Sequence, residues 1–313
     1  MNQFHFGAIV PTYNAGPAFA ECIKALQQQT VVPDSVLVID SSSRDHTVEL
    51  ARQAGFRVEI IPQKDFEHGR TRQQALELFA DIEIVVYLTQ DAVLADPRAL
   101  ETLIKCFDDD RVGTAYGRQL PRLGATPIEA HARLFNYPDR SRLKSWNDRT
   151  TLGFKAAFIS NSFAAYRLKA LNEVGGFPAR NIVSEDTLVS ARMLKAGWLN
   201  RYCAEACVYH SHHYSYVDEF RRYFDIGVFH VSQPWILEEF GAVEGEGRRF
   251  VCSEVEFLCP RHLHLLPSAV LRTLVKYCGF KCGRYEQKLP IVLKKKMTMC
   301  PSYWAKLEST RNA

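Results

Sequence analysis

The chain has 313 residues, of which 47% are hydrophobic and 24% charged, the balance of a soluble globular protein with room for one large domain or two smaller ones. Its formal net charge of +4 is too small to indicate a nucleic-acid partner, and none is expected. The opening residues Met1 to Phe6 lack the features of a signal peptide, and no segment reaches the roughly 18 uninterrupted apolar residues of a membrane span. The nine cysteines lack zinc-site spacing and are expected to be free thiols in a cytoplasmic protein.

Strand and helix patterns alternate along the N-terminal part of the chain. Short β-branched runs predict strands at residues 6–10, 35–39, 57–61 and 82–88. Helical periodicity predicts helices at residues 18–29, 47–54 and 71–79. The short polar connections between them predict an α/β fold, doubly wound, with a mostly parallel sheet covered by helices on both faces. Right-handed crossovers would bring the carboxyl ends of the strands to one edge.

Beyond residue 94 the pattern is less regular. The sequence predicts a helix at 97–107, a strand at 112–116, a strand-like segment at 156–166 and a helix at 186–196. An apolar helix is predicted at 263–275, and a basic, aromatic tail follows it. That region suits either a segment lying at a membrane interface or a helix packed back on the rest of the chain with its basic face exposed.

Polar and acidic side chains follow three of the predicted strands, at the edge where α/β proteins bind ligands. The residues at this edge are Pro11, Thr12, Tyr13 and Asn14 after the first strand, Asp40 after the second and Asp91 after the fourth. Neither GxGxxG nor a P-loop follows the first strand, so the site does not rest on a glycine loop. Asp40 suits a base N–H or a ribose hydroxyl, and the alternative is that it caps the next helix. Asp91 likewise suits a ligand, and its alternative is a turn cap.

Two further pairs of charged residues lie at predicted helix starts. Arg70 and Arg72, beside a glycine, suit either an anion pocket or a solvated basic turn. Glu185 and Asp186 open a helix, where carboxylates favour the helix dipole. One of these carboxylates could instead act as a general base if it faces a pocket.

A histidine pair follows an apolar strand pattern late in the chain. His210 and His212 are two residues apart, so a strand would place both side chains on one face. Imidazoles in that arrangement suit a metal ion or a diphosphate, although single histidines more often serve a structural role.

Taken together, these segments resemble the inverting family 2 glycosyltransferases of GT-A fold, and more closely their bacterial rhamnosyltransferase branch. Any one motif is weak, but the set occurs in the family's order over residues 5 to 230. The matching motifs are residues 9–14, 39–47, 68–72, 88–92, 160–162, 174–178, 184–186, 208–212 and 221–227.

The resemblance implies a divalent cation, Mg²⁺ or Mn²⁺, at Asp91. This residue stands at the last Asp of the family's DxD motif, which holds the cation on the donor diphosphate. The chain has Thr89, Gln90 and Asp91 at these positions, so the first Asp is missing. His210 or His212 would then have to supply a second metal ligand.

The resemblance also implies a catalytic base and a donor site. Asp186 matches the general base that deprotonates the acceptor hydroxyl, and Glu185 is its substitute. Asp40 would read the N3–H of a pyrimidine base. The residues expected to bind the donor are Pro11, Thr12, Tyr13, Asn14, Asp40, Arg70, Arg72, Gln90, Asn161 and Arg222.

The function implied by the resemblance is inverting transfer of a deoxysugar, L-rhamnose from dTDP-β-L-rhamnose, onto a lipopolysaccharide or other cell-surface polysaccharide. The acceptor would be a glycan or a lipid-linked glycan. The alternatives are a family 2 transferase with another donor, such as a UDP-hexose, and a non-catalytic nucleotide-sugar-binding protein.

The expected domain organisation follows from the same resemblance. A catalytic domain would cover residues 1–245, with a nucleotide-sugar half at about 1–117 and an acceptor half at about 118–245. Tyr137 and Trp146 are expected on the acceptor side. A helical, basic C-terminal extension would cover residues 246–313, and the protein would be cytoplasmic with peripheral association at the inner membrane.

Overall fold

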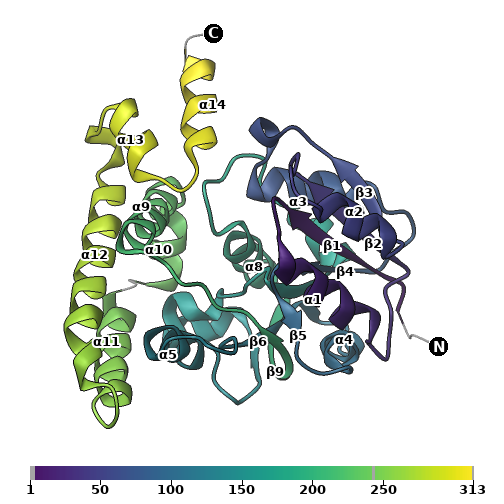
Figure 1. The fold of residues 1–313 in the computed structure, drawn as a ribbon, viewed down its shortest axis with the longest axis horizontal. Coiled ribbons are helices and arrows are strands. Elements are labelled where there is room, and N and C mark those ends of the chain that lie inside the picture. Colours follow the sequence, from purple (N-terminus) through teal and green to yellow (C-terminus); the bar gives the residue numbers. More distant parts are fainter. Residues whose placement is uncertain (1–3, 242–243, 312–313) are drawn as a thin grey trace.

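A mixed β-sheet forms the centre of the protein in a computed structural model, which describes residues 4–241 and 244–311 (Figure 1). Residues Met1 to Gln3, part of the segment considered for a signal peptide, lie outside the described residues. Within that range the strand order is β3-β2-β1-β4-β8-β6-β9-β5, with β7 paired to β9. The strands are β1 (Phe6–Thr12), β2 (Ser35–Asp40), β3 (Arg57–Ile60), β4 (Ile84–Leu88), β5 (Val93–Leu94), β6 (Val112–Leu120), β7 (Arg142–Lys144), β8 (Phe163–Arg167) and β9 (Leu199–Tyr209).

Helices cover both faces of this sheet, and further helices follow its last strand. The helices associated with the sheet are α1 (Pro17–Gln27), α2 (Thr47–Gln53), α3 (His68–Leu76), α4 (Ala99–Ile104), α5 (Pro127–Asn136), α6 (Arg149–Leu152), α7 (Leu168–Glu173) and α8 (Glu185–Lys195). The C-terminal helices are α9 (Tyr216–Ser232), α10 (Pro234–Phe240), α11 (Glu244–Leu258), α12 (Leu266–Arg284), α13 (Ile291–Met297) and α14 (Pro301–Arg311).

The N-terminal part of the sheet has the predicted doubly wound arrangement. β1 pairs in parallel with β2 and β4, and β2 pairs in parallel with β3. Alternate residues of β4 enter opposite cores: Val86 packs with residues of α1 and α4, whereas Tyr87 packs with residues of α3, α7 and α8. The carboxyl ends of these strands therefore meet at one edge, as the sequence predicts.

The second part of the sheet departs from the parallel expectation. β8 runs antiparallel to both β4 and β6, and it covers only the last part of the predicted strand-like segment 156–166. Because β8 is reversed, its beginning rather than its end lies at the shared edge. Asn161, two residues before β8, thereby reaches the same edge as Asp91 after β4. The predicted helix at 71–79 is also shifted, since α3 begins at His68 and ends at Leu76.

The C-terminal extension is helical, as expected, and packs closely on the preceding part of the chain. α9 and α12 touch through glycines: a Cβ at Gly279 would lie 2.4 Å from the carbonyl oxygen of Phe220, and one at Gly283 would lie 2.1 Å from that of Phe224. The predicted helix at 263–275 continues to Arg284. The expected domain boundary at residue 245 falls within α11. Among the described helices, none is both long enough and apolar enough to cross a membrane.

Candidate functional site

Two cavities lie at the carboxyl edge of the sheet. The large cavity, of about 540 Å³, is bordered by the ends of β4 and β9, the start of β8, and helices α3, α5, α8, α9, α11 and α12. The small cavity, of about 470 Å³, is bordered by the end of β1, the segment before α3 and the chain around residue 300. His68 lines both cavities, so they adjoin each other at the start of α3.

The structure brings most of the predicted site residues into these cavities. The large cavity is lined by Arg72, Asp91, Asn161, Glu185, Asp186, His210, His212 and Arg222, and also by Tyr137. The small cavity is lined by Pro11, Thr12, Tyr13 and Gln90. Asn14, Asp40 and Arg70 line neither cavity. Trp146, expected on the acceptor side, instead packs edge-on against Phe240, with ring centroids 5.3 Å apart.

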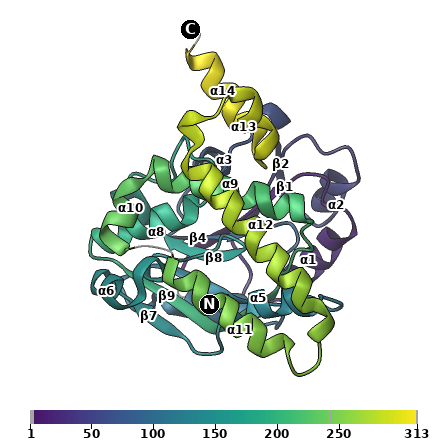
Figure 2. The ribbon, with the colours of Figure 1, turned by 90° about the vertical axis from the view of Figure 1, so that its left-hand side faces the viewer.

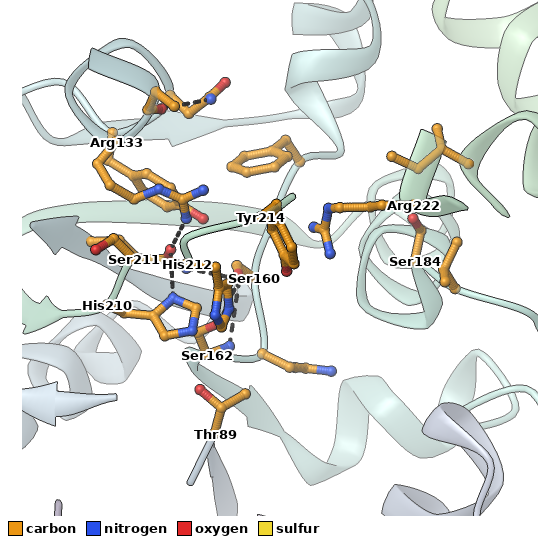
Figure 3. A pocket seen from close by; sticks show the side chains of 18 of the residues that line it. Thr89, Arg133, Ser160, Ser162, Ser184, His210, Ser211, His212, Tyr214 and Arg222 are labelled. Carbon is orange, nitrogen blue, oxygen red and sulfur yellow. Dashed lines mark hydrogen bonds between the residues drawn. The ribbon is translucent and has the colours of Figure 1, made fainter. Parts of the chain in front are cut away.

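Asp91, His210 and His212 form a cluster in the large cavity whose ligand atoms all lie within 4.8 Å of one another. Nε2 of His210 is 3.4 Å from Oδ1 of Asp91, and Nδ1 of His212 is 3.7 Å from Oδ2. Figure 3 shows the two imidazoles next to each other, with Tyr214 and Arg222 beyond them. A carboxylate with two imidazoles is a donor set that suits a divalent transition metal such as Mn²⁺.

The hydrogen bonds of His210 test whether a cation fits this cluster. Nε2 of the Gln119 amide donates to Ser160, so its Oε1 is the acceptor that Nδ1 of His210 contacts at 2.9 Å. His210 therefore carries its proton on Nδ1, and a neutral ring turns the Nε2 lone pair toward the Asp91 carboxylate. Nε2 is buried and has no hydrogen-bond partner within the described residues. The Nε2 lone pair of His210 and the Asp91 carboxylate are both acceptors, and a cation between them could bind to both.

Charge in this cluster follows from burial. Burial lowers the pKa of His210 against the opposing effect of Asp91, and it lowers the pKa of His212 to about 3, so both rings are neutral at neutral pH. Arg122 also contacts Asp91, with its Nη2 3.2 Å from Oδ2. No spacing in the sequence indicates this arginine.

Glu185 and Asp186 begin α8 but have different surroundings. Glu185 is buried and pairs with Arg72, its Oε1 lying 2.9 Å from Nη1 of the guanidinium. Asp186 accepts hydrogen bonds from the backbone N–H groups of Asn161, at 3.1 Å, and Thr187, at 2.7 Å. Burial and the neighbouring charge of Glu185 raise the pKa of Asp186 to about 6. Of the two carboxylates, Asp186 is therefore the one that has no ion-pair partner within the described residues, and its pKa suits general-base chemistry.

Asp40 is fully buried, and its carboxylate is occupied within the chain. Oδ2 accepts from the hydroxyls of Thr12, at 2.8 Å, and Ser43, at 2.6 Å, while Oδ1 accepts from the backbone N–H of Ser43 at 2.7 Å. These bonds join the end of β1 to the turn after β2. The predicted contact of Asp40 with a pyrimidine base stays a prediction.

Of the remaining residues predicted to bind the donor, Gln90 and Asn161 form hydrogen bonds within the chain and Arg70 is exposed. Gln90 links the end of β4 to the end of β1, since its Oε1 accepts from the Tyr13 N–H at 2.7 Å. Asn161 is also held within the chain: its amide donates to Glu185 at 3.3 Å and its Oδ1 accepts from Tyr166 at 2.7 Å. Arg70 is exposed, and nothing places it near either cavity.

The chain around residue 300 forms a wall of the small cavity that the sequence did not reveal. Met299 to Tyr303 line it opposite the end of β1. The wall is anchored by the buried carboxylate of Asp225 on α9, which accepts from the Met299 N–H at 2.9 Å, and by an ion pair of 2.8 Å between Lys306 and Glu67. The small cavity therefore lies between residues that are almost 300 positions apart in the sequence.

Comparison with known proteins identifies the family. The model of glycosyl transferase family 2 matches residues 8–175. The O-antigen chain rhamnosyltransferase RfbN of Salmonella typhimurium is 45% identical over 301 residues, covering 96% of each chain. WbaN of Salmonella anatum, another O-antigen chain rhamnosyltransferase, is 45% identical over 304 residues, covering 97% of this chain and 96% of that one. The chain belongs to glycosyl transferase family 2 and is a glycosyltransferase, which confirms the expected family and its rhamnosyltransferase branch.

Solved structures confirm the expected GT-A type of fold. The mannosyltransferase PcManGT from Pyrobaculum calidifontis, in complex with GDP-Man and Mn²⁺, superposes with a TM-score of 0.59 at 17% identity, over 91% of this chain and 85% of that one. TarS 1–349 of S. aureus in complex with UDP-GlcNAc gives a TM-score of 0.51 at 17% identity, over 98% and 91% of the two chains. At such identities the likeness concerns the fold alone.

Proposed function

We propose that this protein transfers L-rhamnose, with inversion, from dTDP-β-L-rhamnose to the growing glycan of an O-antigen. The observation that carries the proposal is the 45% identity to two O-antigen chain rhamnosyltransferases along nearly the whole of both chains. The two adjoining cavities at the sheet edge support it, because a nucleotide sugar and an acceptor need neighbouring sites.

The donor would lie across both cavities. Its nucleoside would occupy the small cavity, between the end of β1 and residues 299–303, where Phe66 and Tyr303 offer aromatic surface. Its diphosphate would reach the end of β4 beside Asp91, and its sugar would enter the large cavity. Arg222 in the large cavity would contribute positive charge toward the diphosphate.

A divalent cation, Mn²⁺ or Mg²⁺, would be held by Asp91, His210 and His212. When bound, it would neutralise negative charge on the departing diphosphate. The two imidazoles favour Mn²⁺ over Mg²⁺, which prefers oxygen ligands. The hydrogen bond from His210 to Gln119 orients the ring for this task.

Asp186 would be the general base. It takes the proton of the acceptor hydroxyl as that oxygen bonds to the anomeric carbon, and the bond from that carbon to the diphosphate breaks. Attack from the face opposite the leaving group converts the β-linked donor into an α-linked product. The backbone N–H groups of Asn161 and Thr187 hold the carboxylate in place, and its raised pKa makes it a better proton acceptor than an ordinary aspartate.

The acceptor would be a lipid-linked glycan presented at the cytoplasmic face of the inner membrane. One relative with 26% identity, covering 64% of this chain and 74% of its own, is an N-acetylglucosaminyl-diphospho-decaprenol L-rhamnosyltransferase of Mycobacterium tuberculosis. The large cavity has room for a sugar acceptor beside Asp186, between α5 and α9.

A panel of nucleotide sugars tests the proposal. Thermal unfolding is measured with Mn²⁺ and dTDP-β-L-rhamnose, UDP-glucose, UDP-N-acetylglucosamine or GDP-mannose, and NMR of the product then gives the anomeric configuration. We expect the largest stabilisation with dTDP-β-L-rhamnose and an α-linked product. Stabilisation by a UDP-hexose alone would contradict the rhamnose assignment, and donor binding without any transfer would favour a non-catalytic binding protein.

A further inference from the structure

Positive charge is concentrated in one segment near the C-terminus. Between Arg261 and Trp304 the sequence has nine lysines and arginines but one acidic residue, Glu286. The rest of the chain holds 30 basic and 34 acidic residues, so it is slightly negative although the whole chain carries +4. A basic block on an otherwise acidic protein indicates an anionic partner for that block.

α12, which lies in this segment, exposes an apolar stripe. Val270 is 55% exposed, Leu274 56% and Tyr277 59%, and Leu271 beside them is 47% exposed. Spacings of four and three residues place Val270, Leu274 and Tyr277 on one face of the helix. Figure 2 shows α12 running diagonally across the side of the molecule that faces the viewer.

The opposite face of α12 already has its partner, so the stripe is not needed for folding. Gly279 and Gly283 lie against the backbone of α9, and Arg272 and Lys276 pair with Glu219 of α9 at 3.1 and 3.6 Å. These contacts fix the rotation of α12 about its axis. The apolar stripe is therefore presented outward by a rigidly packed helix.

Basic and aromatic side chains continue the stripe at the C-terminal end of α12. Arg284 and Lys288 are exposed, and Lys288 lies over the ring of Tyr285, 5.3 Å from its centroid. Tyr285 itself is 59% exposed. Apolar residues next to tyrosines and cations are the side-chain set of a helix that lies in the interface of a lipid bilayer.

We propose that the outer face of α12 docks on a membrane surface rich in anionic lipid, with Val270, Leu274 and Tyr277 entering the interface. Arg284 and Lys288 would contact the headgroups. A second copy of the chain is the poorer partner, because pairing two such faces would bring two basic clusters together. A membrane meets both features at once, since it offers an apolar layer beneath a negative surface.

This docking would also explain the position of the acceptor site, a point that rests on the proposed function. Arg272 and Lys276, on the inner side of α12, line the large cavity. One helix thus borders the membrane surface on its outer side and the acceptor cavity on its inner side. A glycan attached to a membrane lipid would reach the cavity without leaving the surface.

Co-sedimentation of the full-length protein with lipid vesicles tests the docking. Vesicles of phosphatidylcholine alone are compared with vesicles containing phosphatidylglycerol, in the absence of donor and metal, so the outcome does not depend on glycosyl transfer. We expect binding to the anionic vesicles that weakens as salt is raised. Equal binding to both vesicle types, or binding to neither, would overturn the proposal.

Three variants locate the surface. Leu274→Glu should weaken vesicle binding at least tenfold, and Arg284→Gln with Lys288→Gln should weaken it about 30-fold, since each cation near an anionic surface contributes about fivefold. Ile60→Glu, at a similarly exposed position on β3, should bind as the parent does. All should retain the parent's unfolding temperature and its transfer to a water-soluble acceptor. Unchanged vesicle binding by Leu274→Glu, or a dimer of the parent that this substitution dissociates without any vesicle binding, would refute the assignment.

Discussion

Replacing Asp186 with asparagine should separate the catalytic effect of this carboxylate from its effect on stability. Loss of a general base lowers a rate by about 10²- to 10⁴-fold. We expect the kcat of Asp186→Asn to fall within that range. Donor affinity, measured by titration calorimetry, should change little, because the nucleoside is proposed to lie in the small cavity, which Asp186 does not line.

The same substitution should change stability in a pH-dependent way. The pKa of Asp186 is raised from 3.8 to about 6 on folding, so the folded state disfavours the charged form. The penalty is absent at low pH, where both states hold the proton. It grows as pH rises from about 4 to about 6, and then stays at ~3 kcal/mol. Asparagine avoids this penalty, but it loses one of the two hydrogen bonds from Asn161 and Thr187, which costs about 1–3 kcal/mol.

Urea unfolding of the parent and of Asp186→Asn at pH 5 and pH 8 isolates the charge effect. The lost hydrogen bond costs the same at both values, so it cancels when the two differences in unfolding free energy are compared. The variant should gain about 1.4 kcal/mol relative to the parent on going from pH 5 to pH 8. No such gain would show that the carboxylate has an ordinary pKa, and a kcat within tenfold of the parent would refute its role as base.

Three further substitutions test other parts of the structure. Asp91→Asn should weaken Mn²⁺ binding, measured by calorimetry, by at least about 100-fold. Losing a residue that only hydrogen-bonds to a metal ligand costs about 10- to 100-fold, and losing a ligand itself should cost more. Unchanged affinity would contradict the role of Asp91 as a ligand. Gly283→Ala should lower the free energy of unfolding, measured in urea, by about 1–3 kcal/mol, because its Cβ would lie 2.1 Å from the Phe224 carbonyl oxygen. The control Gly245→Ala, whose Cβ would have no atom within 4 Å, should not lower that free energy. Asp225→Ala should weaken nucleotide binding about 5- to 10-fold, the effect of one hydrogen bond of about 1 kcal/mol to the wall of the small cavity; full affinity would show that this wall does not contact the nucleotide.

The sequence predicts the N-terminal half of the fold well, because its signals are local. Each apolar run followed by a helical pattern gives one β-α unit, and parallel pairing then follows from the handedness of the crossovers. The sequence therefore predicts that Asp91 and Thr12 lie at one edge of the sheet. The reversed direction of β8 has no local signature, since it depends on which strands it joins.

The proximity of Asp91 and His210 is an example of a contact that the sequence pattern does not predict. It depends on β5 pairing antiparallel with β9, where Val93 lies opposite Tyr209. β5 has two residues, too few for a periodic pattern, and its partner is more than a hundred residues away. Motif resemblance could bring these residues together, but spacing along the chain could not.

Asp40 shows a second kind of limit. The sequence indicates a carboxylate at a strand end, but the direction of a side chain depends on neighbours from elsewhere in the chain. Thr12 lies on the adjacent strand and Ser43 three residues on, and together they draw both oxygens inward. The sequence does not predict the wall at residues 299–303 or the Arg122 contact either, because both depend on long-range contacts without a repeating pattern.

The wall of the small cavity has a consequence for how the protein is made. Ribosomes release a chain from its N-terminus onward, and the sheet edge with Tyr13 and Asp91 is complete long before Met299 and Tyr303 emerge. A nascent chain that has reached residue 245 already contains the residues proposed as base and metal ligands, yet the small cavity still lacks one side. The chain would then be able to hold the proposed nucleotide only after residues 299–303 have been made, so a chain terminated before them would not bind the donor.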